Sequence, residues 1–171
     1  MSVPQVYTFD IKPDPDTLDV KPGYVHVPNL GRFSTKDCAG KPLPMGDLLR
    51  AHGASLSGRF ARANDMTIVK VMNSRTVRLK VSWPGYADWI TDINAGPIGS
   101  MATQVATVFK TFLANSSGHR KAGVLSDWNI QTKRFTLEDF ALVAIVHLGE
   151  DLFTAEIEQV QCRPGSPRGR F

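Results

Sequence analysis

The sequence is poor in cysteine, in long apolar runs and in segments that direct a protein to a membrane. Only two of its 171 residues are cysteine, Cys38 and Cys162. No stretch approaches the roughly 18 consecutive apolar residues of a membrane-spanning helix, and residues 1–5 lack the basic and apolar segments of a secretory signal. These absences favour an intracellular protein, cytoplasmic or nuclear, with two free thiols; a disulfide between them is the alternative.

The sequence also lacks the spacings by which metal sites and catalytic centres are recognised. Its histidines and cysteines form no C-x-x-C, H-x-x-x-H or H-x-E pair. Residues 96–100, Gly-Pro-Ile-Gly-Ser, match neither nucleotide-binding fingerprint and predict a turn followed by a helix N-cap. We therefore expect no metal and no cofactor, and we favour a protein that is not an enzyme.

The remaining composition is that of an ordinary globular protein. Apolar residues make up 42% of the chain and charged residues 21%, which suits one well-buried core. No linker or internal repeat divides the sequence. We predict a single domain over residues 1–162 and a basic tail over residues 163–171 that does not fold alone.

Apolar periodicity predicts an α+β fold. Two amphipathic helices are expected, over residues 45–56 and from Ser100 to about residue 113. The clearest strand signal is a hairpin in which residues 66–72 and 76–83 flank the turn 73–75. Further strands are predicted over residues 6–11, 24–27, 128–131, 140–148 and 153–158, with a long loop over residues 29–44. This order predicts an antiparallel β-sheet with the two helices packed on it.

Positive charge is concentrated in the middle of the chain. Residues 51–134 contain eleven Lys or Arg and only four Asp. Apolar residues of strand 76–83 alternate with Arg78 and Lys80, so one face is predicted to be buried and the other basic. Such a face attracts the phosphates of nucleic acid or anionic lipid head groups. The residues predicted to bind a polyanion lie around this hairpin and in the tail: Arg59, Arg62, Lys70, Arg75, Arg78, Lys80, Arg163, Arg168 and Arg170.

Three aromatic residues, Trp83, Tyr86 and Trp89, follow the basic hairpin directly. Rings beside basic side chains can stack on nucleic-acid bases or contact a protein or lipid surface. We consider these three residues as an interaction surface. The alternative is that their rings pack into the core and the basic face is an ordinary solvated one.

In its order of elements and its basic charge, the chain resembles the matrix proteins of negative-strand RNA viruses, and small viral coat proteins are also basic and β-rich. The resemblance implies a non-enzymatic structural protein that assembles with itself on an anionic surface. We therefore expect a homo-oligomer that contacts RNA or an anionic membrane and has no small-molecule substrate. Two alternatives stay open. One is a small enzyme or ligand-binding domain with a site assembled from Asp47, His52, Ser55 and Ser57; the other is a protein-interaction module that uses residues 83–89.

Overall fold

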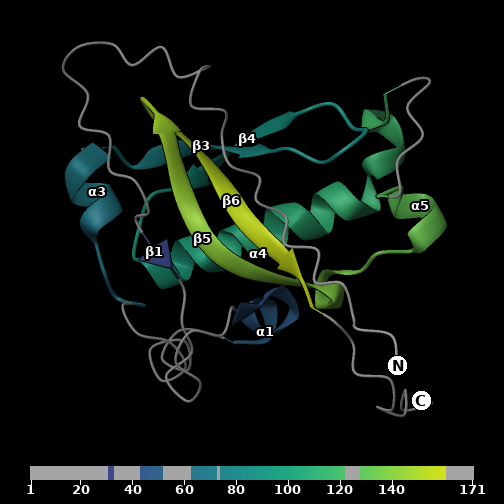
Figure 1. The fold of residues 1–171 in the computed structure, drawn as a ribbon. Helices are drawn as coiled ribbons and strands as arrows, with labels where there is room; N and C mark the ends of the chain where they lie inside the picture. The colour runs from purple at the N-terminus through teal and green to yellow at the C-terminus, as the bar shows by residue number, and fades with distance from the viewer. Residues whose placement is uncertain (1–30, 33–42, 52–62, 73, 122–127, 161–171) are drawn as a thin grey trace, which may run out of the picture.

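The sheet is built around the hairpin of its two longest strands, β5 (Phe140–Gly149) and β6 (Leu152–Gln159). The computed structural model describes residues 31–32, 43–51, 63–72, 74–121 and 128–160, and the strand order is β1-β5-β6-β3-β4 (Figure 1). The short strands β1 (Gly31–Arg32) and β2 (Leu43–Pro44) both pair with β5. β5 is apolar along almost its whole length, as expected of a strand in the interior of a sheet.

A tight turn that depends on glycine joins β5 to β6. Gly149 has a φ of 121° and Glu150 a φ of 49°. The first value is open to glycine and is strained for any residue with a Cβ atom. Both strands lie within one residue of the bounds predicted at each end, so the strands expected over residues 140–148 and 153–158 are confirmed.

The sheet is mixed rather than antiparallel. β3 (Thr76–Val81) pairs antiparallel with β4 (Trp89–Asn94) and parallel with β6. A parallel pair needs a crossover connection, and the chain between β3 and β6 supplies it through helix α4 (Ile98–Ala114) and β5. The predicted α+β class is confirmed, whereas the purely antiparallel sheet is wrong.

The predicted hairpin is wrong in its first half. Thr67–Met72 forms the helix α3, and β4 is the antiparallel partner of β3. The β-branched residues of this segment favour a strand intrinsically, but tertiary packing decides its conformation. Ile68 is fully buried, and Met72, one helical turn later, packs against the same core.

The strand predicted over residues 128–131 is also wrong, because its second half begins a helix. Asn129 caps α5 (Ile130–Lys133), and its side chain accepts hydrogen bonds from the backbone N–H groups of Gln131 at 3.1 Å and Thr132 at 3.2 Å. A capping asparagine satisfies amides that the first turn of a helix leaves without a partner, which favours the helix over the predicted strand. α3 and α5 therefore add to the two helices that were expected.

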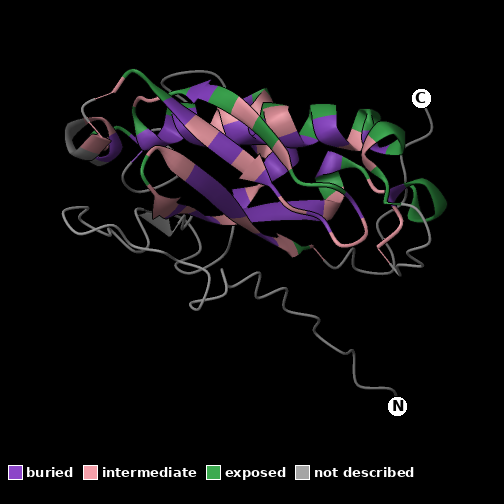
Figure 2. Ribbon diagram, turned by 90° about the horizontal axis from the view of Figure 1, so that it is seen from above, coloured by how far each residue is buried: buried purple, intermediate pink, exposed green. Residues whose placement is uncertain are grey.

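Helices α1 (Met45–Arg50) and α4 pack against each other, and α4 also contacts the sheet. α4 begins at Ile98, two residues before the predicted cap Ser100, and buries an apolar stripe that includes Val105, Phe109 and Phe112. α1 ends at Arg50, and the rest of the predicted helix, residues 52–56, lies outside the described residues. Figure 2 shows the buried positions along the central strands and on α4.

Side chains of β3 alternate between the core and the opposite face of the sheet. Val77, Leu79 and Val81 are fully buried, whereas Arg78 and Lys80 are half-buried on the other face. The predicted division of this strand into an apolar and a basic face is confirmed. The strands predicted over residues 6–11 and 24–27 and the tail 163–171 lie outside the described residues, and the loop predicted over 29–44 contains β1 and β2.

Candidate functional site

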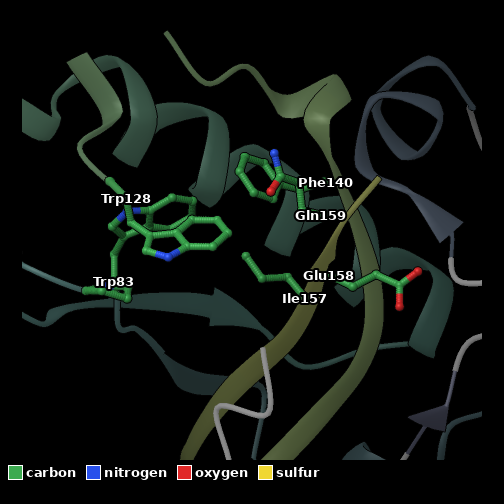
Figure 3. A pocket seen from close by; sticks show the side chains of 7 residues that line it. Trp83, Trp128, Phe140, Ile157, Glu158 and Gln159 are labelled. Carbon is green, nitrogen blue, oxygen red and sulfur yellow. Dashed lines mark hydrogen bonds between the residues drawn. The ribbon is translucent and has the colours of Figure 1, made fainter. Parts of the chain in front are cut away.

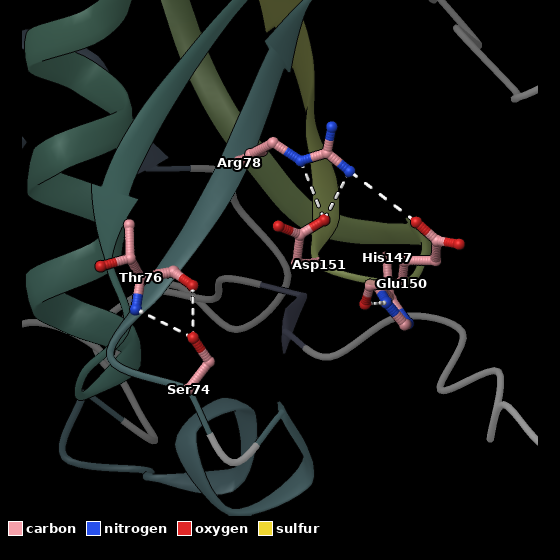
Figure 4. A network of polar contacts seen from close by, with 6 residues as sticks. All are labelled: Ser74, Thr76, Arg78, His147, Glu150 and Asp151. Carbon is pink, nitrogen blue, oxygen red and sulfur yellow. Dashed lines mark hydrogen bonds and ion pairs between the residues drawn. The ribbon is translucent and has the colours of Figure 1, made fainter.

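The two bases of the predicted polyanion face, Arg78 and Lys80, are both engaged in ion pairs. The Nε and Nη2 atoms of Arg78 donate to Oδ1 of Asp151 at 2.8 and 2.6 Å. Figure 4 shows these side-chain contacts; in addition, the backbone N–H of Arg78 donates to the carbonyl of Asp151 at 2.8 Å, so the same two residues are joined twice. Lys80 Nζ lies 2.9 Å from Oδ2 of Asp88. The positive charge of this face is therefore compensated within the fold.

These contacts lower the pKa values of both aspartates. Hydrogen bonds from Arg78, followed by its charge, lower the pKa of Asp151 against the opposing effect of burial. For Asp88, burial alone would raise the pKa, but hydrogen bonds from Lys80 and Ser82 and the charges of Lys80 and Lys121 together lower it. Both carboxylates are ionised at neutral pH and hold their basic partners in place.

His147 belongs to the same corner of the sheet. Its Nε2 lies 2.7 Å from the carbonyl oxygen of Glu150 and must carry the hydrogen of that bond. Its Nδ1 is buried and has no hydrogen-bond partner among the described residues, and its ring stacks on Phe153 with centroids 4.7 Å apart. The ring fixes the β5–β6 turn against the core.

The other predicted polyanion residues are divided between the surface and the undescribed part of the chain. Arg75 is exposed in the turn before β3. Lys70 lies on α3, and its side chain is outside the described set. Also outside it are the remaining predicted bases, Arg59, Arg62, Arg163, Arg168 and Arg170. Only Arg75, Arg78 and Lys80 of the predicted set can therefore be placed.

The predicted interaction residues Trp83 and Tyr86 lie in the core, at 5% and 2% exposure. The indole N–H of Trp83 donates to the carbonyl of Trp128 at 2.8 Å, and the hydroxyl of Tyr86 accepts from the N–H of Ile130 at 3.1 Å. Trp89 is half-buried and stacks on Phe112 with centroids 6.1 Å apart. Two of the three rings thus hold α5 against the sheet, and Trp89 alone of the three is partly open to a partner.

An apolar pocket lies beside Trp83. It is small, with a cavity volume of about 20 Å³, and is lined by Trp83, Trp128, Phe140 and Ile157 together with Glu158 and Gln159 (Figure 3). Burial, followed by the charge of Glu156, raises the pKa of Glu158. The Glu158 carboxylate nevertheless points away from the tryptophan rings, so the pocket offers apolar contact and no acid or base.

The end of the molecule formed by α5 and the 3₁₀ helix η2 (Ser116–His119) carries bases that form no ion pair with any described residue. Arg120 and Lys121 follow η2 and are exposed, as are Lys133 at the end of α5 and Arg134 after it. No carboxylate of the described residues lies within 4.0 Å of any of the four charges, although Lys121 is near enough to Asp88 to lower its pKa. We call these four residues the basic end.

Tyr86 brings the two halves of the basic end together. Tyr86 forms an isolated β-bridge with Arg120, and the N–H of Lys121 donates to the carbonyl of Gly85 at 3.0 Å. The Tyr86 hydroxyl bonds to Ile130, the first residue of α5, and α5 contacts η2. Figure 1 shows α5 and the C-terminal end of α4 together, at the opposite end of the molecule from α3.

Sequence reasoning missed the basic end because eleven residues separate its two halves, which are joined only by tertiary contacts. One signal was present: between residues 110 and 137 the only acidic residue is Asp127. A strand with alternating basic residues is the more conspicuous pattern, but cross-strand neighbours such as Asp92, opposite Arg78, are invisible until the register is known.

Of the four residues of the alternative catalytic site, the structure describes only Asp47. Asp47 pairs with Arg50 at 2.8 Å, and His52, Ser55 and Ser57 lie outside the described residues. Among the residues that the structure describes, no three His, Cys, Asp or Glu are grouped as metal ligands would be. None of the helices described is long and apolar enough to cross a membrane.

Comparisons with known proteins add no relative. No protein-family model, no curated protein and no solved structure matches the chain.

Proposed function

We propose that this protein is a non-enzymatic structural protein that assembles with itself and binds a polyanion, and that the basic end makes the polyanion contact. The observation that supports this site is the contrast between paired and unpaired bases. Arg78 and Lys80 are held by carboxylates, whereas the four charges of the basic end have no ion-pair partner among the described residues. An unpaired surface base can release the counterions of a phosphate without first breaking an ion pair.

We favour nucleic acid over a membrane as the polyanion. The exposed large apolar side chains of the described residues are Met66 and Ile90, and neither belongs to α5 or η2. The basic end therefore has no apolar anchor to insert into a bilayer, and charge alone gives weak attachment to lipid. Beside Arg134, the half-buried rings of Trp128 and Phe135 stack with centroids 5.6 Å apart, a platform of the kind on which bases stack.

The test is the salt dependence of binding to a fluorescent single-stranded RNA oligonucleotide, measured by anisotropy. Each phosphate contact contributes about 0.7 to the slope of log affinity against log salt for a single strand. Changing all four bases of the basic end to Gln should therefore weaken binding and reduce the slope by up to about 3. Vesicles containing an anionic lipid, measured in parallel by co-sedimentation, separate the two kinds of polyanion.

A matched pair of double variants removes the effect of net charge. Lys133→Gln with Arg134→Gln and Arg75→Gln with Lys110→Gln each remove two exposed bases that pair with no carboxylate in the described part of the chain, the second pair from outside the basic end. We expect the first variant to lose more affinity than the second. Equal losses would show that the contact is not localised at this end, and tighter binding to vesicles than to RNA would replace nucleic acid by a membrane surface.

A further inference from the structure

β4 forms the outer edge of the sheet, and its backbone register identifies which of its polar groups face away from β3. The N–H of Ala95 donates to the carbonyl of Arg75 at 2.9 Å, which makes these residues a hydrogen-bonded pair. Because such pairs alternate along an antiparallel ladder, the backbone groups of Ile90, Asp92 and Asn94 point outward.

One end of this edge is closed by a side chain of α4. The N–H of Asn94 donates to Oε1 of Gln104 at 2.8 Å, and Nε2 of Gln104 donates to the carbonyl of Asn94 at 3.0 Å. The amide of Gln104 thus takes the place of a neighbouring strand at Asn94. In the described part of the chain, the outward backbone groups of Ile90 and Asp92 have no such cover.

The side chains of β4 do little to prevent another strand from pairing with it. Natural edge strands are protected by lysine, proline, bulges or covering segments. β4, with the sequence Trp-Ile-Thr-Asp-Ile-Asn, has no lysine and no proline, and Ile90 is 49% exposed. Asp92 is its single charge.

We propose that β4 is the surface on which a second copy of this chain docks, so that two β4 strands pair antiparallel and the sheets of two subunits become continuous. In this arrangement Ile90 lies opposite the partner subunit's Asp92, and Thr91 lies opposite the partner subunit's Thr91. Each Ile90–Asp92 pair exchanges two backbone hydrogen bonds, and the two-fold axis passes between the threonines.

The charges of the strand and the position of Gln104 select this register over its neighbours. A register centred on Asp92 places the two Asp92 carboxylates directly opposite each other and uses Asn94, which Gln104 already occupies. A register centred on Ile90 places Asp88 opposite the partner subunit's Asp92. Like charges directly opposite each other destabilise an antiparallel pair, so the register centred on Thr91 is the one without a conflict.

This inference rests on the self-association in the proposed function and names its surface. The test is sedimentation velocity of the full chain, freed of nucleic acid, over roughly 1 to 200 µM, the range of weak association. Ile90→Asp should weaken the dimer by about tenfold or more, because the symmetry places the new carboxylate opposite Asp92 twice. Ile90→Lys should leave the dimer intact, because a lysine there faces the partner's carboxylate. Met66→Asp, at the other exposed apolar side chain, is the matched control and should change nothing.

A cross-link tests the register directly. In a background in which Cys38 and Cys162 are changed to Ser, Thr91→Cys should form a disulfide dimer on mild oxidation, because opposed residues of a non-hydrogen-bonded pair have Cα atoms about 4.5 Å apart. Thr107→Cys, exposed on α4, should not.

The outcomes separate the interface from the proposed function. A wild-type dimer that withstands Ile90→Asp, or that Ile90→Lys disrupts as strongly as Ile90→Asp, overturns the β4 interface or its register while self-association stands. A wild-type chain that is monomeric over the whole range overturns both. Binding of RNA by the basic end is measured independently and is unaffected by either result.

Discussion

Trp83 offers the strongest test of whether the aromatic residues after β3 belong to the core or to a binding surface. Its indole is 5% exposed and lies among the rings of Phe112, Trp128, Phe135 and Phe140, with centroids 5.2 to 6.2 Å away. Truncating a buried tryptophan to alanine costs about 3–5 kcal/mol. The same change removes the hydrogen bond from the indole N–H to the carbonyl of Trp128. We therefore expect Trp83→Ala to lower the free energy of unfolding by about 4 kcal/mol.

Urea denaturation followed by far-UV circular dichroism measures this change without relying on the fluorescence of the residue removed. Met66→Ala is the matched control, because Met66 is 38% exposed, lies outside the proposed β4 interface, and its truncation should cost no more than about 0.5 kcal/mol. Trp83→Phe should fall between the two, since it keeps most ring contacts and loses the hydrogen bond. If Trp83→Ala lowers the free energy of unfolding by less than about 1 kcal/mol, the ring does not support the core, and residues 83–89 should again be considered as an interaction surface.

Three further predictions follow from the turn and the acidic residues of β6. Arg78 lowers the pKa of Asp151 in the folded state. The Asp151 carboxylate therefore stabilises the fold above its unfolded pKa of about 3.9, and this stabilisation is lost as the pH falls through the folded value. In urea titrations, Asp151→Asn should accordingly destabilise the protein more at pH 7 than near pH 3. Burial raises the pKa of Glu158 in the folded state, so ionisation of this carboxyl opposes folding as the pH rises. Glu158→Gln should therefore raise the urea concentration at the unfolding midpoint at pH 7 but not at pH 4. A lower midpoint at pH 7 would contradict the burial argument. Gly149→Ala should lower the free energy of unfolding, measured by thermal denaturation, by about 1–3 kcal/mol. The cause is the backbone conformation alone, because φ is 121° and no atom lies within 4 Å of the added Cβ. A neutral result would show that the turn readily takes another conformation.

Apolar periodicity predicted the elements whose packing is decided by their own sequence. β5 and β6 are long, and α4 has a continuous apolar stripe, so each has a single arrangement that buries its apolar side chains. α3 and α5 are six and four residues long, and at that length intrinsic preference is outweighed by one buried side chain or one cap. Ile68 and Asn129 are those residues, and neither stands out in the sequence.

The parallel pairing of β3 with β6 could not be predicted from local pattern. A strand that alternates apolar and polar residues, as β3 does, is typical of an antiparallel sheet with one solvated face. Its partner lies more than seventy residues later in the chain, and the contact that fixes the pairing is the double link between Arg78 and Asp151. Arg78 was thus recognised in the sequence as a functional residue, but the structure gives it a role in joining two strands.

The same pairing explains why a count of basic residues does not locate an anion site. Each of the ion pairs Arg78–Asp151 and Lys80–Asp88 joins a positive and a negative charge and so has no net charge. Salt screens what field remains, over a Debye length of about 8 Å at physiological ionic strength. Changing Arg78 and Lys80 to Glu would place carboxylates against carboxylates, so the loss of binding that such a variant suffers would report a damaged fold as readily as a lost contact. Changes to Lys133 and Arg134 disturb no ion pair of the described residues. Their effect on RNA binding therefore measures the interaction itself.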